Sequence, residues 1–214
     1  MTRAPDRIDV EPTRRGRPRT APDRSQARAK LIAAGLIHLT EKGYTAAGVD
    51  DVLASSGVPK GSFYYHFQNK ADFGLALIEA YHNYFQRKLD AALLTPDLPP
   101  LQRIKAFTDD ATAGMRRHGF TRGCLVGNLG QEMGALPEEF RDRLIAVLQD
   151  WQNRVATCLE LAQAEGTLAV RHDPHALAAN FWIGWEGAVL RAKLERRADP
   201  LTGFADFFLE HLTS

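Results

Sequence analysis

The chain has 214 residues, 44% of them hydrophobic, and a formal net charge of +1 at pH 7, which suits a globular protein with one small module and a larger body. Two cysteines are too few for a disulfide framework, and no apolar run approaches the roughly 20 residues that cross a bilayer. No apolar segment follows a charged N-terminal start, so we expect a cytoplasmic protein without membrane partners. Long alternating β-branched runs are missing, which favours an all-α fold.

The small net charge hides an asymmetry between the two ends of the chain. Residues 1–70 carry twelve Lys and Arg against seven Asp and Glu, a local excess of +5, and the other 144 residues carry −4. Only the front of the chain is therefore suited to a polyanion such as DNA.

Residues 1–24 are rich in Arg, Pro, Asp and Thr and are almost free of apolar side chains, which predicts a disordered basic arm. Its segment "RRGRPR" places Arg14, Arg15, Arg17 and Arg19 around a glycine and a proline. An extended strip of this kind can enter a narrow minor groove, where arginine is attracted by the negative potential. A solvated basic tail is the alternative.

Apolar periodicity, caps and glycine or proline breakers predict nine helices after this arm. Residues 25–70 are expected to form a small three-helix domain, and residues 71–214 a larger helical domain. The helices are expected at about 25–42, 49–56, 59–67, 70–94, 101–118, 124–135, 137–166, 174–194 and 200–212.

The second and third predicted helices are short and joined by "SGVP", which is typical of a helix-turn-helix. Gly57 permits the positive φ that this tight turn needs. The stretch "VDDVLASSGVPKGSFYYHFQNKADF", from Val49 to Phe73, resembles the helix-turn-helix signature of the TetR/AcrR family of bacterial repressors. The resemblance covers about residues 25–212. It implies an N-terminal DNA-binding module followed by a helical bundle for ligand binding and dimerisation.

The first turn of the third predicted helix offers free N–H groups and a positive dipole end to a phosphate or base edge. Tyr65 is open to a second interpretation as a core residue. Where family members usually carry Thr or Ser as the cap of the second helix, this chain has Ala47-Gly48, which removes a side-chain cap and a phosphate contact. The resemblance implies DNA contacts by Lys60, Gly61, Ser62, Tyr64, Tyr65, His66 and Lys70.

The last two predicted helices carry more apolar surface than one core needs. The segment "HALAANFWIGWEGAVLRAKL" is apolar on more than one face, so it can line a core and also meet a partner. The family resemblance implies a homodimer through these two helices, with each module on one half of an inverted-repeat operator. We expect Phe204, Phe207, Phe208 and Leu212 to contribute to the interface.

The stretch "RGCLVGNLGQEMG" places Cys124 among four glycines at the expected start of the sixth helix. Together with "FWIGWEGAVLRAKLE" it resembles the acrylate-responsive and electrophile-sensing branch of the family. That resemblance implies that Cys124 and Lys193 form a sensing pair. A helix N-terminus and a lysine both lower a thiol pKa, so a reactive thiolate is expected. Inert filling is the alternative for Cys124, as it is the interpretation of Cys158.

Other ligand-pocket candidates follow from helical spacing. Core packing is the alternative for Trp182, and a solvated surface is the alternative for Lys193. His118, Arg122 and Arg191 offer positive charge to an anionic effector. The remaining candidate sensor residues are Asn128, Gln131, Glu132, Trp182, Trp185 and Glu186.

Two rival classes are disfavoured by the sequence. No nucleophile, base and orienting residue share a spacing typical of an enzyme, so no catalytic residue or cofactor is expected. His172 and His175 flank Asp173, but a helix cap explains this arrangement better than a metal site. The sequence predicts a repressor released from its operator by a small effector, acrylate or a related unsaturated acid, with a thiol-based electrophile or redox sensor as the alternative.

Overall fold

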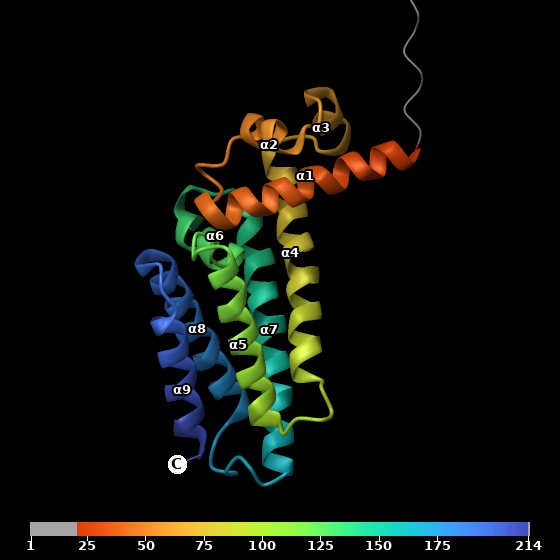
Figure 1. Ribbon diagram of the computed structural model, residues 1–214. Helices are drawn as coiled ribbons and strands as arrows, with labels where there is room; N and C mark the ends of the chain where they lie inside the picture. Colours follow the sequence, from red (N-terminus) through yellow and green to blue (C-terminus); the bar gives the residue numbers. More distant parts are fainter. Residues whose placement is uncertain (1–20, 214) are drawn as a thin grey trace, which may run out of the picture.

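A computed structural model of the chain describes residues 21–213. Across these residues the fold is all-α, with nine α-helices and one short 3₁₀ turn and without strands (Figure 1). The elements are α1 (Ala21–Lys42), α2 (Val49–Ser56), α3 (Lys60–His66), α4 (Lys70–Leu93), α5 (Pro100–Arg117), α6 (Leu125–Glu132), η1 (Met133–Ala135), α7 (Glu139–Ala164), α8 (Pro174–Glu195) and α9 (Asp199–Thr213).

The predicted fold class, helix number and helix order are confirmed for these residues. α2 has the predicted bounds, and Asp173 caps α8 by accepting hydrogen bonds from the backbone N–H groups of His175 and Ala176. The start of α1 was predicted wrongly, because the helix begins at Ala21 and so includes the last four residues of the expected arm. The four arginines between positions 14 and 19 lie outside the described residues.

The small N-terminal domain is closed by aromatic packing around α3. Phe63 is fully buried and contacts the rings of Phe67 and Phe73, which ties α3 to the start of α4. Gly57 ends α2 with a φ of 64°, the left-handed conformation predicted for the turn. Gly48 caps α2 without a side-chain hydrogen bond, as expected from the missing Thr or Ser.

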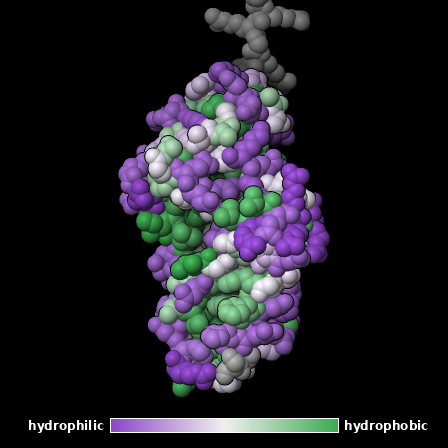
Figure 2. All heavy atoms as spheres, turned by 90° about the vertical axis from the view of Figure 1, so that its left-hand side faces the viewer, coloured by the Kyte–Doolittle hydropathy of each residue, from purple (hydrophilic) through white to green (hydrophobic). Residues whose placement is uncertain are grey.

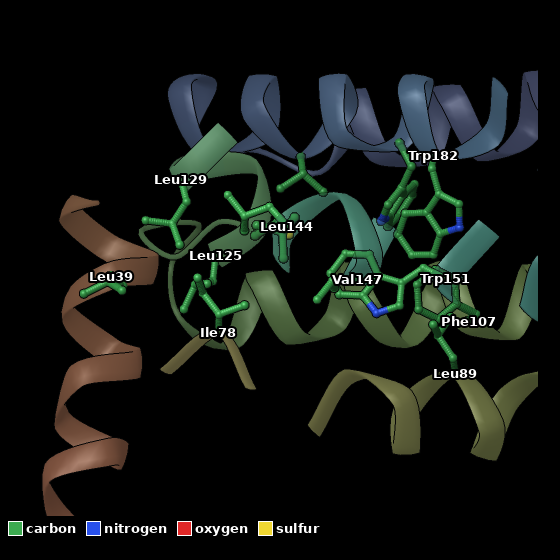
Figure 3. Close-up of a cluster of buried hydrophobic side chains, with 14 of the residues drawn as sticks. Leu39, Ile78, Leu89, Phe107, Leu125, Leu129, Leu144, Val147, Trp151 and Trp182 are labelled. Carbon is green, nitrogen blue, oxygen red and sulfur yellow. The ribbon is translucent and has the colours of Figure 1, made fainter. Parts of the chain in front are cut away.

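α4 links the two domains, because it begins beside α3 and runs down the length of the bundle (Figure 1). In the bundle α7 packs against α4, α5 and α8, and α9 packs against α8 and α5. Trp151 of α7 and Trp182 of α8 meet with ring centroids 5.0 Å apart, and Phe107 of α5 joins them (Figure 3). Burial of large aromatic side chains therefore holds the bundle together.

α1 lies across the top of the bundle and is in close contact with it (Figure 1). A Cβ at Gly35 would lie 2.6 Å from the ring of Phe73, so α1 and α4 approach at a residue without a side chain. Further along α1, the buried Leu39 faces Leu125 and Leu129 of α6 (Figure 3). The first three helices thus share a continuous apolar core with the larger helical bundle.

Candidate DNA-binding surface and ligand cavity

The outer face of α3 combines exposed aromatic and polar groups. Tyr64 and Tyr65 are 55% and 61% exposed, which is unusual for side chains of this size and rules out the core alternative for Tyr65. Gly61 is also exposed and has open space where a Cβ would stand, so another backbone can approach it. Ser62 and His66 are partly exposed on the same short helix.

The two cationic side chains near α3, Lys60 and Arg24, each interact with a neighbouring side chain. The Lys60 ammonium forms an exposed ion pair of 3.0 Å with Asp50 of α2. Arg24 of α1 lies over the ring of Tyr65 and donates a hydrogen bond of 2.9 Å to its hydroxyl. These exposed contacts cost little to exchange for phosphate contacts.

Lys70 differs from the other predicted DNA contacts. Its ammonium donates a hydrogen bond of 2.8 Å to the backbone carbonyl of Tyr44 and stands 4.3 Å from the centre of that ring. Partial burial lowers the Lys70 pKa, although Glu132 opposes the shift. In this structure Lys70 fastens the loop before α2 to α4 instead of extending beside α3.

A cavity of about 300 Å³ lies where α1 meets the larger helical bundle. Most of its wall is apolar, as in many small-molecule sites. Three predicted sensor residues, Cys124, Trp185 and Glu186, lie in this wall, and the first two are buried. The complete wall consists of Leu36, Ile37, Thr40, Tyr81, Tyr84, Phe85, Lys88, Ala111, Gly114, Met115, Arg117, His118, Arg122, Gly123, Cys124, Trp185, Glu186 and Val189.

Three ionisable side chains meet inside this cavity, and we call them the cavity triad: Tyr81, Cys124 and Glu186. The Cys124 thiol lies within hydrogen-bonding reach of both the Tyr81 hydroxyl and the Glu186 carboxylate. A Cβ at Gly127 would collide with the Glu186 carboxylate, so one glycine of the unusual stretch makes room for this acid. Burial raises the pKa of Glu186 to about 7.

The expected low pKa of Cys124 is wrong. Burial and the nearby Glu186 carboxylate raise the pKa of this thiol well above its ordinary value, and the backbone N–H of Gly127 and the Tyr81 hydroxyl only partly oppose them. Lys193 does not line the cavity. Its ammonium donates a hydrogen bond of 3.0 Å to the Thr40 carbonyl, and burial lowers its pKa.

Several predicted pocket residues on α6 and α8 instead contact the C-terminal end of α1 and the loop that follows it. The Thr40 carbonyl accepts hydrogen bonds of 3.0 Å from Lys193, from the Asn128 amide and from the Gly123 backbone N–H. The Glu132 carboxylate accepts hydrogen bonds of 3.0 and 2.7 Å from the backbone N–H groups of Tyr44 and Thr45. We call Asn128, Glu132 and Lys193 the α1 clamp.

Two further predicted sensor residues lie away from the cavity wall. Gln131 is exposed on α6, because it directly precedes the clamp residue Glu132 and so points about 100° away from it around the helix. Trp182 is buried against Trp151 in the aromatic core, as its alternative interpretation states. Assigning either residue to the pocket was wrong for this structure.

Of the three positive groups that the sequence offered to an anionic effector, two line the cavity and one does not. His118 and Arg122 line the cavity, where Arg122 also pairs with Glu41 of α1 at 3.0 Å. Arg191 instead forms an exposed ion pair with Glu195 on the surface of α8. Among residues 21–213, no group of three or more metal-ligating side chains is present.

The chain matches known families over both of its domains. Residues 31–77 match the family described as "Bacterial regulatory proteins, tetR family", and residues 100–208 match "Tetracyclin repressor-like, C-terminal domain". The chain belongs to the TetR family. It is therefore a DNA-binding transcriptional regulator, and α3 lies within the residues that match the first of these two families.

Named relatives match the TetR-family chain over nearly its full length. The transcriptional regulator AcuR of Cereibacter sphaeroides is 60% identical over all 214 residues and 97% of its own length. The transcriptional repressor NemR of Escherichia coli is 29% identical, covering 81% of this chain and 87% of NemR.

Solved structures agree with this family assignment. A regulatory protein TetR from Rhodobacter sphaeroides is 63% identical, with a TM-score of 0.85, over 86% of this chain and 98% of that one. The reduced form of E. coli NemR is 27% identical, with a TM-score of 0.78, over 85% of this chain and 94% of that one.

Sequence reasoning missed how much of this regulator's cavity comes from α1 and α4. Tyr81, Tyr84, Phe85 and Lys88 repeat at helical spacing, which marks one stripe of α4. Thr40 gave no signal, because its contribution to the clamp is a backbone carbonyl. A stripe that lines a cavity and a stripe that fills a core have the same sequence pattern.

The outer face of α8 and α9 carries large apolar side chains. Ile183, Leu190 and Leu194 of α8 are 71%, 45% and 80% exposed, and Phe207 of α9 is 68% exposed. Figure 2 shows hydrophobic surface on the side of the molecule where these two helices lie. Phe208 and Leu212 are instead buried within the protomer, contrary to their expected place at an interface.

None of the helices within residues 21–213 combines the length and the apolar character that crossing a membrane requires.

Proposed function

We propose that this TetR-family protein is a transcriptional repressor that binds an inverted-repeat operator as a homodimer and releases it when a small unsaturated acid or related electrophile occupies the cavity. Acrylate is the first candidate, from the resemblance to the acrylate-responsive branch. The observation that carries the proposal is the composition of the cavity wall. Leu36, Ile37 and Thr40 of the DNA-binding module line it together with sensor residues, so an occupant touches both domains.

The proposed DNA contacts lie on the exposed face of α3. Lys60, Tyr64 and Tyr65 are free to reach phosphates once Lys60 exchanges its exposed partner Asp50. Gly61, Ser62 and His66 complete the surface that approaches base edges. Lys70 supports this surface through Tyr44. The arm residues Arg14, Arg15, Arg17 and Arg19 are proposed to add minor-groove contacts.

The proposed dimer forms through α8 and α9. Ile183, Leu194 and Phe207 expose apolar surface there, and contiguous exposed apolar surface often marks a protein interface. A two-fold dimer of this kind places two α3 helices about one DNA turn apart.

Operator release follows from a change in the position of the DNA-binding module. An occupant pressed against Thr40 and Tyr81 acts on α1, through the α1 clamp, and on α4. Either movement alters the separation of the two α3 helices. The required difference in ligand affinity between the two states is only a few kcal/mol.

Operator binding and release can be tested with promoter fragments that contain inverted repeats. Fluorescence anisotropy is expected to show salt-sensitive binding and release by members of a panel of unsaturated acids, thioesters and aldehydes. Ala111→Trp fills the cavity and is expected to keep operator binding but lose release. Ala146→Trp, on the exposed surface of α7, is the matched control. If the folded wild-type protein binds none of the inverted-repeat fragments, the proposal is contradicted.

A thiol-based sensor is the second candidate, because Cys124 lies in the cavity wall with Lys193 close to the neighbouring Gly123. Mass spectrometry after exposure to acrylate, methylglyoxal or hypochlorite tests this version. It predicts modification of Cys124 and a Cys124→Ser protein that stays on its operator. Release of the operator by an unmodified protein supports reversible ligand binding instead.

A further inference from the structure

The cavity triad arranges three different proton-bearing groups around one sulfur. The Cys124 thiol lies between the Glu186 carboxylate, which accepts a proton, and the Tyr81 hydroxyl, which donates a hydrogen bond. The backbone N–H of Gly127 adds a second donor on the sulfur side. The acceptor can remove the proton of the thiol, and the two donors can then stabilise the negatively charged sulfur.

The surroundings of Cys124 do not provide a resting thiolate. Burial and the Glu186 charge both favour the neutral thiol, and the ammonium of Lys193 is bound to the Thr40 carbonyl. Because only the thiolate is an effective nucleophile, the thiol needs a local base at the moment of reaction.

We infer that Glu186 is the base that activates Cys124 toward an uncharged α,β-unsaturated carbonyl compound held in the cavity. This inference rests on the proposed function, since it assumes that the cavity is the sensor site. It adds a catalytic residue and a ligand class to that function. Glu186 reaches the reacting sulfur directly, which separates its role from that of Lys193 in the α1 clamp.

The reaction is an addition in which all atoms and electrons are retained. Glu186 takes the proton from the thiol while the sulfur electron pair forms a bond to the β-carbon of the alkene. The carbon–carbon π pair moves toward the carbonyl and gives an enolate. The proton on Glu186 then returns to the α-carbon, so the carboxylate is regenerated and neither oxidant nor reductant is consumed.

The charge of Glu186 also selects which ligands react with the thiol, as distinct from those that only bind in the cavity. A carboxylate that must be ionised to act as a base repels a ligand carboxylate placed beside the same sulfur. An amide, ester, aldehyde or thioester lacks that charge and has a more electron-poor alkene. The cavity of about 300 Å³ is largely apolar and accepts such a compound.

The groups that face Glu186 determine the pH dependence. Tyr81 of α4 and Cys124 at the start of α6 contact it directly. Four basic residues from α4, the end of α5 and the following segment share the cavity wall: Lys88, Arg117, His118 and Arg122. Since burial raises the Glu186 pKa to about 7, the carboxylate becomes available as the pH rises through that value.

Intact-protein mass spectrometry with acrylamide, an uncharged unsaturated amide, tests the inference on the full chain. Cys158→Ser leaves Cys124 as the single thiol, and this background is used throughout. We expect one adduct per chain, formed faster as the pH rises through about 7 and faster than with acrylate. Glu186→Gln is expected to slow the reaction by roughly 100-fold or more and to abolish this pH step. Glu195→Gln, on the same helix outside the cavity, is the matched control.

Two controls keep the result interpretable. Thermal unfolding checks that Glu186→Gln is folded, and Glu186→Asp, which keeps the carboxylate, is expected to restore part of the rate. Equal rates and pH profiles in the Glu186→Gln and Glu195→Gln proteins would overturn the inference. Operator release by acrylamide without an adduct would also overturn it while leaving the proposed function intact.

Discussion

The cavity triad and the α1 clamp both draw on α6 with its N-cap and on α8, and the triad adds Tyr81 of α4, but the two sets contact different parts of the molecule. Cys124 and Glu186 turn toward the cavity, whereas Asn128 and Lys193, one or two turns further along α6 and α8, reach the end of α1. In the proposed function, the first set detects an occupant and the second holds the DNA-binding module. Under this proposal, sensing and transmission are therefore separated by position along α6 and α8, since residues four or seven positions apart share nearly the same helix face.

The two sets also differ in their electrostatics. Burial raises the pKa values of all three triad groups, and that of Glu186, at about 7, lets this one member change its charge near neutral pH. The clamp joins charged and amide groups to backbone groups at the end of α1, where a cation such as Lys193 satisfies a free carbonyl. Changes in the triad should alter pH dependence, and changes in the clamp should alter domain coupling.

The largest expected effect belongs to Glu186→Gln. The Glu186 pKa is about 7 in the folded chain against 4.5 ordinarily, so the folded state keeps a proton that the unfolded chain loses. Wild-type stability therefore falls as the pH rises from about 4.5 to 7, by up to about 3 kcal/mol, and the glutamine variant escapes this loss. Urea unfolding at pH 5 and pH 8 should show the variant to be the more stable protein only at pH 8. A constant difference between the two proteins would contradict the burial of this acid.

Glu132→Ala is expected to have the next largest effect. It removes the acceptor for the backbone N–H groups of Tyr44 and Thr45, and hydrogen bonds to charged groups are worth about 2 kcal/mol. Urea unfolding measures this loss. Gln131→Ala, one residue away and exposed, should change stability by less than about 0.5 kcal/mol. Equal losses in the two variants would show that Glu132 does not hold the loop after α1.

A smaller effect is expected for Asn128→Ala. The amide donates to the Leu39 and Thr40 carbonyls, and Thr40 keeps its other donors, Gly123 and Lys193. We expect a loss of about 1 kcal/mol in unfolding free energy. Hydrogen exchange at the C-terminal end of α1 should accelerate in parallel. Unchanged exchange there would indicate that Asn128 does not support the helix end.

Much of the fold follows from local signals. Gly57 and Asp173 marked helix ends correctly because a left-handed turn and a side-chain cap are decided within a few residues. The start of α1 was misplaced because its first turn, which begins at Ala21, has few apolar residues whose spacing could indicate a helix.

The candidate site was only partly predictable for a different reason. The family resemblance singled out Cys124 and helical spacing singled out Trp185 and Glu186, and all three lie in the cavity wall. Neither signal could show that Lys193 binds a backbone carbonyl of α1, or that Tyr81 rather than a lysine adjoins the thiol. Those contacts depend on how α1 and α4 pack against the sensor domain.

The most direct test of the division between detection and transmission is one pair of measurements on Lys193→Met. This variant keeps an apolar stem beside Gly123 but cannot donate to the Thr40 carbonyl. We predict that calorimetry will show unchanged acrylate affinity, while anisotropy will show that the acrylate-induced loss of operator affinity shrinks by about fivefold. A variant that releases its operator as readily as the wild type would contradict the clamp as the route to α1.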